Sequence, residues 1–199
     1  MDLVLWIHRR MTAFARALAV LGGVVLFLLI LLTCISIAGR GLNTLLHAGF
    51  VQELMPRVAR ALLDAGVGPV DGDFEIVQAG IAATIFAFLP WAQITGGHAT
   101  VDLLTMRLPE RVQRVLMALW EVVFALILVI IARQLEIGMQ SKIRTGQTTF
   151  ILQFPLWWGY AASLVGAVAA ALVAIWSAFI RVLEAIGGRP VATEHIGEI

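Results

Sequence analysis

The sequence predicts an all-α integral membrane protein, with four transmembrane helices and an amphipathic interfacial helix in the first loop. Hydrophobic residues make up 60% of the 199 positions, charged residues make up 14%, and the mean hydropathy is +0.93. Soluble domains are nearer to about 45–50% apolar and about 25% charged residues. Four long stretches are free or almost free of charge, and none alternates with the period of two that is typical of barrel strands. These observations together favour membrane-spanning helices.

The low-charge stretches place the spans in a single membrane domain that covers residues 1–199. We expect the spans at about residues 17–38, 74–96, 112–134 and 153–180. At a rise of 1.5 Å per residue, each is long enough to cross a hydrocarbon core of about 30 Å. The last stretch is longer than one crossing needs, so its aromatic-rich start is expected to lie outside the hydrocarbon.

The flanking charges predict that both termini are cytoplasmic. Arg9, Arg10 and Arg16 precede the first span, and the basic flank of the first helix usually dominates orientation. The first apolar run is too long for the core of a signal peptide, and no A-x-A cleavage site follows it. The first loop, residues 39–73, is rich in Asp and Glu, which suits an external position.

This first loop contains an amphipathic stretch with helical spacing, in which Pro56 must either kink the helix or sit in its first turn. Its apolar positions are Val51, Leu54, Met55, Val58 and Leu62. Its charged positions lie on the opposite face and are Glu53, Arg57, Arg60 and Asp64. The charged face is a candidate docking surface for an external partner, and the apolar face is typical of a helix lying in the membrane interface. Both interpretations can hold together.

An aromatic cluster stands at the entrance to the last span. Trp157, Trp158 and Tyr160 follow Pro155, and such clusters typically anchor a helix at the level of the lipid headgroups. A platform for stacking sugars is the functional alternative. We therefore expect these three side chains to be membrane-belt anchors.

Glu121 is the one charged residue within the four low-charge stretches and lies well inside the third predicted span. Charged side chains at this depth usually face protein, water or a partner. Arg114 lies seven positions earlier, on the same helical face. Three interpretations remain open: a hydrogen bond within a helix interface, a contact with another subunit, and part of a proton or ion path.

The sequence shows none of the common motifs for catalysis or for binding a metal or cofactor. It contains no HExxH, CxxC, GxSxG or Walker motif, and its four histidines do not form the intramembrane pair that a haem would need. Lys and Arg number 14 against 13 Asp and Glu, so no basic field exists to attract nucleic acid. We expect no catalytic residue, no metal site and no cofactor.

Small residues recur at helical spacing in three spans. They are Ala79, Ala83 and Ala87 in the second span, Ala118, Ala125 and Ala132 in the third, and Gly159, Ser163, Gly166, Ala167, Ala170, Ala174 and Ala178 in the fourth. Such seams let membrane helices approach closely. They predict a tight four-helix unit with surface left over for a partner.

Three segments carry a resemblance to a known family. Residues Ala92 to Leu116 read AQITGGHATVDLLTMRLPERVQRVL, Thr149 to Tyr160 read TFILQFPLWWGY, and Arg40 with Asn43 forms an R-x-x-N end to the first span. Together with an acidic start to the second span, these segments resemble the small membrane subunit of tripartite ATP-independent periplasmic (TRAP) transporters, the DctQ-like family. The resemblance covers about residues 10 to 185, and the first loop is longer here than in many members.

The resemblance implies a scaffold that binds no substrate itself. The family's small subunit pairs with a large membrane subunit that carries substrate and sodium, and a periplasmic binding protein delivers organic acids such as dicarboxylates. The implied partners are therefore these two proteins and membrane lipid, and the implied location is the inner membrane of a bacterium. Candidate residues for the contact with the large subunit are Arg40, Glu75, His98, Asp102, Arg114 and Glu121.

Three rival functions share the four-span architecture. They are the small subunit of a tripartite tricarboxylate transporter, the membrane anchor of a redox enzyme, and an autonomous small channel or exporter. The GGHxxVD and LPxR pattern separates the first rival, haem absorbance would reveal the second, and transport by the chain alone would reveal the third.

Overall fold

A computed structural model describes residues 2–95 and 109–187 of the chain, and the described part is helical apart from short connections. The helices are α1 (Asp2–Leu46), α2 (Gly49–Leu54), α3 (Pro56–Asp64), α4 (Asp73–Ile94), α6 (Glu110–Thr145) and α7 (Trp157–Gly187). Four of these, α1, α4, α6 and α7, are long and apolar enough to cross a membrane. The predicted fold class, an all-α membrane protein with four transmembrane helices, is confirmed.

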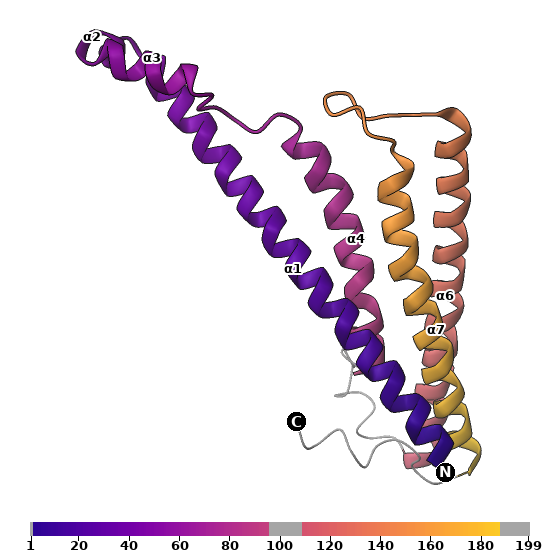
Figure 1. Cartoon of the computed structure of the whole chain (residues 1–199). Coiled ribbons are helices and arrows are strands. Elements are labelled where there is room, and N and C mark those ends of the chain that lie inside the picture. Colours follow the sequence, from indigo (N-terminus) through magenta and orange to yellow (C-terminus); the bar gives the residue numbers. More distant parts are fainter. Residues whose placement is uncertain (1, 96–108, 188–199) are drawn as a thin grey trace.

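The four long helices stand in a row in the order α1, α4, α7, α6 (Figure 1). Helix α7 lies between α4 and α6, whereas α1 packs mainly on α4 and leans away from the other helices. We call the end that carries α2, α3 and the α6–α7 connection the loop end. The opposite end, where α1 begins and α7 ends, is the terminal end. The even number of crossings places both of these helix ends on the same side.

The helices do not stop where the predicted spans stop. Helix α1 continues to Leu46, into the segment predicted as loop, and α6 continues to Thr145. Hydropathy marks the thickness of the lipid, whereas backbone hydrogen bonding continues for as long as no residue interrupts it. Helix α7 starts at Trp157 rather than at residue 153, because residues 147–156 form a tight hairpin. In it the Thr149 amide donates to the Phe154 carbonyl at 3.0 Å.

Small residues mark the interfaces between the long helices, as the seams predict. A Cβ atom built on Gly22 of α1 would lie 3.0 Å from the Cβ of Ala87 on α4. One built on Gly166 of α7 would lie 2.7 Å from the backbone carbon of Phe86, also on α4. The alanines of α7 form the centre of the core, and the buried ones include Ala167, Ala170, Ala174 and Ala178. Close approach of backbones therefore holds α4, α6 and α7 together.

Helices α2 and α3 form an arm, residues 49–64, at the loop end of α1 (Figure 1). Of the two predicted places for Pro56, the structure shows the first turn of a helix: the amphipathic stretch is divided at Met55, and Pro56 begins α3, where its missing amide hydrogen leaves no helix bond unmade. The arm is tied to α1 by short-range bonds. The Gln52 side chain of α2 donates to the Leu46 carbonyl at 3.4 Å, and the Ala48 amide, directly before α2, donates to the Leu45 carbonyl at 3.0 Å.

Candidate functional site

Asp73 fastens the first turn of α4 to α1. The Ser36 hydroxyl, fully buried on α1, donates a hydrogen bond to Asp73 Oδ2 and accepts one from the Val70 amide at 3.2 Å. The Arg40 guanidinium lies 3.9 Å from the same carboxylate oxygen, and its side chain is largely exposed. The carboxylate of Asp73 thus contacts a hydroxyl group and a guanidinium group from successive turns of α1.

The R-x-x-N motif at the end of the first span helps to hold the start of α4 and the connection before it against α1. Arg40 faces Asp73, and Asn43 Nδ2 donates to the Val67 carbonyl at 3.1 Å, so both side chains hold the segment that leads into α4. Gly39 leaves the room for this segment, since a Cβ atom there would collide with the Gly68 carbonyl. The motif therefore has an internal structural role in this chain.

Glu75 fastens the same turn of α4 to the hairpin between α6 and α7. Its Oε1 accepts from the Ile151 amide at 2.8 Å, and its Oε2 accepts from the Leu152 amide at 2.9 Å. Gly72 sits in the left-handed region with φ +75° and lies under the Leu152 side chain, where a Cβ atom has no room. Consecutive amides that converge on one carboxylate form a strong, directional contact.

Ser36, Arg40, Asp73 and Glu75 together form what we call the polar clamp. Asp73 and Glu75 are two positions apart, so they point to nearly opposite sides of α4 at about 100° per residue. One acidic residue therefore reaches α1 and the other reaches the hairpin. Arg40 and Glu75, predicted to contact a partner, are here engaged within the chain, and a partner contact for them stays a prediction.

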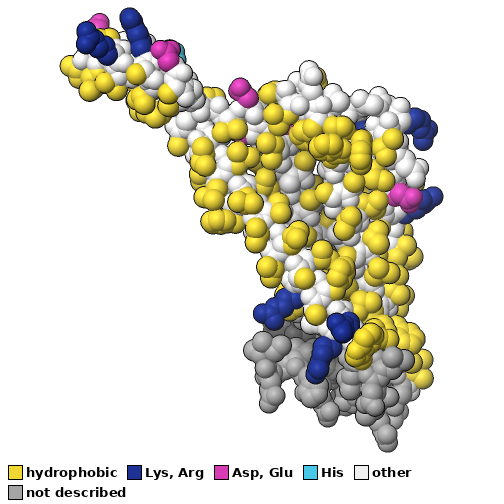
Figure 2. All heavy atoms as spheres, in the orientation of Figure 1, with side chains coloured by type: hydrophobic (Ala, Val, Ile, Leu, Met, Phe, Trp, Pro, Cys, Tyr) yellow, Lys and Arg dark blue, Asp and Glu magenta, His cyan; other side chains and the backbone are white. Residues whose placement is uncertain are grey.

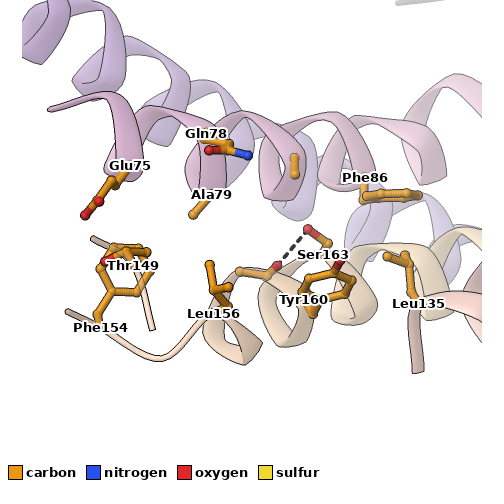
Figure 3. Close-up of a pocket in the computed structure, with 12 residues that line it drawn as sticks. Glu75, Gln78, Ala79, Phe86, Leu135, Thr149, Phe154, Leu156, Tyr160 and Ser163 are labelled. Carbon is orange, nitrogen blue, oxygen red and sulfur yellow. Dashed lines mark hydrogen bonds between the residues drawn. The ribbon is translucent and has the colours of Figure 1, made fainter. Parts of the chain in front are cut away.

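A cavity of about 330 Å³ opens below the clamp, between α4, α7 and α6 (Figure 3). Glu75, Gln78 and Phe86 of α4 border one side. Tyr160 and Ser163 of α7 border the other, and Ser163 donates its hydroxyl proton to the Gly159 carbonyl at 2.8 Å. The lining contains no Lys or Arg. Across residues 2–95 and 109–187, no group of His, Cys, Asp or Glu side chains could hold a metal ion.

Two of the three predicted belt anchors, Trp158 and Tyr160, point in different directions. Trp158 is exposed, stacks on Phe154 with ring centroids 6.3 Å apart, and meets Trp157 edge-on at 6.2 Å. Tyr160 instead turns toward α6, where a Cβ atom on Gly138 would lie 2.8 Å from its ring. Trp158 has the outward position that an interfacial anchor needs, whereas Tyr160 fills space between helices. Anchoring of the three residues in lipid stays a prediction.

Near the terminal end, Glu121 of α6 is paired with a residue of α4. Gln93 Nε2 donates to Glu121 Oε2 at 2.6 Å, and Gln93 is only 2% exposed. Of the three interpretations of Glu121, a hydrogen bond within a helix interface is the one seen here. Arg114 is half-buried on the same helix. Sequence reasoning missed Gln93, although an amide inside an apolar span was a signal for it.

The remaining candidates lie at the surface or outside the described residues. Glu53, Arg57, Arg60 and Asp64 are all exposed on the arm. His98 and Asp102 fall outside the described residues. One surface was missed altogether: the tip of the hairpin, where Phe150 is 97% exposed beside Ile151 and Leu152. Apolar residues in a short connection were the available signal.

Comparison with known families gives a match to most of this architecture. The family model described as "Tripartite ATP-independent periplasmic transporters, DctQ component" matches residues 55–185, from the arm through α4 and α6 to α7. Neither the curated proteins nor the solved structures provide a match. The matched range contains Asp73 and Glu75 of the clamp, the Gln93–Glu121 pair and the hairpin. The chain belongs to the DctQ family and is a small membrane component of a TRAP transporter.

Proposed function

We propose that the chain is the scaffold subunit of a sodium-coupled TRAP transporter that imports organic acids such as dicarboxylates. In this proposal it pairs with the large membrane subunit, which carries substrate and sodium, and it helps to dock the periplasmic binding protein. The family match over residues 55–185 is the observation that carries the proposal. The chain itself performs no catalysis and binds no substrate.

The charge of the cavity supports a scaffold without a substrate site. An organic acid needs a cationic or amide-rich site to replace its hydration, and Arg is the usual partner of a carboxylate. The cavity lining offers no Lys or Arg, and its one charged group is the carboxylate of Glu75. A dicarboxylate would therefore be repelled there.

The exposed apolar surface supports pairing with a larger membrane protein. Helix α6 ends the row and has α7 as its main neighbour, so much of its surface faces outward. The exposed side chains there include Leu119, Trp120, Leu126 and Ile130. Membrane subunits associate through such faces by packing rather than by exclusion of water.

Co-purification tests the proposed subunit role. A tagged chain expressed with its neighbouring genes should recover a large permease, and the binding protein should bind the pair. Haem absorbance in the purified material would instead identify a redox anchor. Transport by the chain alone in liposomes would identify an autonomous channel or exporter, and either result would contradict the proposal.

For orientation, we propose that the terminal end is cytoplasmic. Arg9, Arg10 and Arg16 are all exposed at the start of α1, and positively charged flanks remain on the cytoplasmic side. Reporter fusions after Val67 and after Arg144 should therefore report a periplasmic position. Fusions after Arg107 and at the C-terminus should report a cytoplasmic one. The inverted pattern would overturn the orientation and the docking role of the loop end.

For docking, we propose that the charged face of the arm contacts the binding protein. Exposed charges at the rim of an interface mainly alter association rate and specificity. Reversing Arg57 and Arg60 to Glu should lower uptake at low salt, without loss of the membrane complex. Reversing Lys142 and Arg144 on α6 is the matched control, because it changes the same net charge at the same end. Unchanged uptake in the arm variant, or equal loss in both, would contradict this role.

A further inference from the structure

The arm exposes an apolar face that no described part of the chain covers. Its contacts with the long helices are made mainly with α1, and Ala59 is its one buried residue among those described. Leu54 is 79% exposed, and Phe50, Met55 and Val58 are each exposed over about half of their surface or more. A stripe of this width on a short helix is unstable in water.

The apolar face of the arm continues the apolar surface of α1. Figure 2 shows hydrophobic side chains on the side of the arm that faces the terminal end, and charged side chains on the opposite side. Between the two surfaces lie Leu42 and Leu45, both exposed on the last turns of α1. Lipid surrounds α1 because it is a membrane-spanning helix, so the same lipid meets the underside of the arm.

The length of α1 brings the arm to the level of the headgroups. From Ala17, just after the last basic residue of the first turns, to Leu46 at the start of the arm, the helix is about 45 Å long. A bilayer including its headgroups is about 40–45 Å thick. Because α1 leans, it spans less of the membrane than this length, but still more than a hydrocarbon core of about 30 Å. With its basic flank at one headgroup region, α1 therefore brings the arm to the other headgroup region.

The balanced charges of the arm favour a zwitterionic lipid surface over an anionic one. Arg57 and Arg60 are balanced by Glu53 and Asp64, so residues 49–64 have no net charge. Attraction to anionic lipid requires an excess of Lys and Arg, which the arm lacks. Its affinity must then come from apolar burial, which salt hardly affects.

We propose that the arm lies on the lipid surface at the loop end, with Leu54 and Val58 immersed below the headgroups and Glu53 and Arg60 in water. Because Gln52 of the arm bonds to Leu46 and Asn43 of α1 bonds to Val67 just after the arm, this position of the arm holds the outer turns of α1 at a fixed depth. The proposal concerns the chain by itself and does not depend on the TRAP partners. The lipid is a bilayer surface of zwitterionic headgroups.

Site-directed spin labels test this position of the arm at the lipid surface, in the full chain reconstituted in phosphatidylcholine vesicles. In a Cys34→Ser background, labels are placed at Leu54→Cys and Val58→Cys on the apolar face and at Glu53→Cys and Arg60→Cys on the charged face. All four positions are exposed, so a cysteine there removes little packing. A label on the native Cys34, which is exposed on α1, is the control for contact with lipid.

We expect labels at Leu54 and Val58 to behave like the Cys34 control. Collisions with oxygen, which dissolves in lipid, should exceed collisions with a water-soluble nickel chelate several-fold, and the ratio should be inverted at Glu53 and Arg60. Low and high salt should give the same ratios. Equal access of nickel to both faces would overturn the proposal. So would labels at Leu54 and Val58 that neither reagent reaches in the assembled complex, since a protein partner would then cover the face.

Discussion

Helices α1 and α7 are both strongly apolar, yet they occupy opposite environments. In the most apolar window of α7, 56% of the residues are buried within the chain, against 11% for α1. The difference follows side-chain size rather than hydropathy. Helix α7 presents glycine and alanine to its neighbours, whereas α1 presents leucine, isoleucine and phenylalanine outward. Small residues therefore distinguish a central membrane helix from a peripheral one.

The two helices are also held in different ways. Helix α7 contacts α4 and α6 along its length through buried alanines. Helix α1 packs on one main neighbour, α4, with Gly22 against Ala87, and is fixed to it near the loop end by Ser36 and Arg40. Changes in the α7 seam should therefore affect the whole fold, and changes in the clamp should affect one end of it.

The largest effect is expected at Gly166, in the seam between α7 and α4. In Gly166→Ala the new methyl group meets the backbone of Phe86 at 2.7 Å, so the two helices must separate. Overpacking of this kind costs about 1–3 kcal/mol in the free energy of unfolding. Thermal unfolding of the purified chain in detergent measures the loss.

Gly23 on α1 provides the matched control for this change. A Cβ atom there has no heavy atom within 4 Å among the described neighbours, so Gly23→Ala gains only helix propensity, about 0.5–1 kcal/mol. We expect an unchanged or slightly raised melting temperature. Equal destabilisation by both substitutions would show that α1 is as tightly packed as α7, contrary to the comparison.

A smaller and local effect is expected in the polar clamp. Asp73→Ala removes the acceptor of the Ser36 hydroxyl and the partner of Arg40, so the outer turns of α1 lose their tie to α4. We expect faster hydrogen exchange at the Val70 amide, which donates to Ser36, with the hairpin unaffected. Hydrogen exchange followed by mass spectrometry resolves the two segments.

Glu75→Ala is the reciprocal change on the other side of α4. It removes the acceptor of the Ile151 and Leu152 amides, so exchange should rise at the hairpin and remain unchanged at Val70. If either variant speeds hydrogen exchange in both segments, the clamp acts as one cooperative unit. The view that α1 is fastened to α4 independently of the hairpin would then be wrong.

The smallest effect is expected at the Gln93–Glu121 pair. Hydrogen bonds between membrane helices average about 0.6 kcal/mol, so Glu121→Leu should destabilise the chain slightly. Glu121→Gln should cost less, because the amide oxygen can still accept from Gln93. Gln93→Leu is the matched control for the pair. Recovery of the large subunit that falls with Glu121→Leu but not with Gln93→Leu would place Glu121 in a direct subunit contact.

The sequence was sufficient to predict the four membrane crossings. Charged side chains are costly in lipid, so they are almost absent from the spans and the spans can be recognised. The sequence could not give the helix ends. Leu46 and Thr145 lie beyond the apolar runs, and only backbone hydrogen bonds continue to them. The amphipathic stretch was visible from its spacing, and Pro56 predicted either a kink or a helix start, but only the structure shows that a new helix starts there.

The candidate site was less predictable, because its residues act in pairs. Arg40 and Glu75 were evident as charges at the ends of spans, but their partners were not. Arg40 faces the carboxylate of Asp73, and Glu75 accepts from two backbone amides of the hairpin. Ser36 carries no signal of its own within an apolar helix. Likewise Glu121 was evident as a lone charge, whereas Gln93 became its partner only through the packing of α4 near α6.

The position of α7 in the row has a consequence for the order of assembly during synthesis. Helices α1 and α4 leave the ribosome first and can pair at once, but α6, which follows next, is not the main neighbour of α4. Helix α7 must enter between α4 and α6 to join them (Figure 1). Until it has been made, α6 remains in the bilayer without its main packing partner. The nascent chain is therefore open to rearrangement and to quality control until α7 has been inserted.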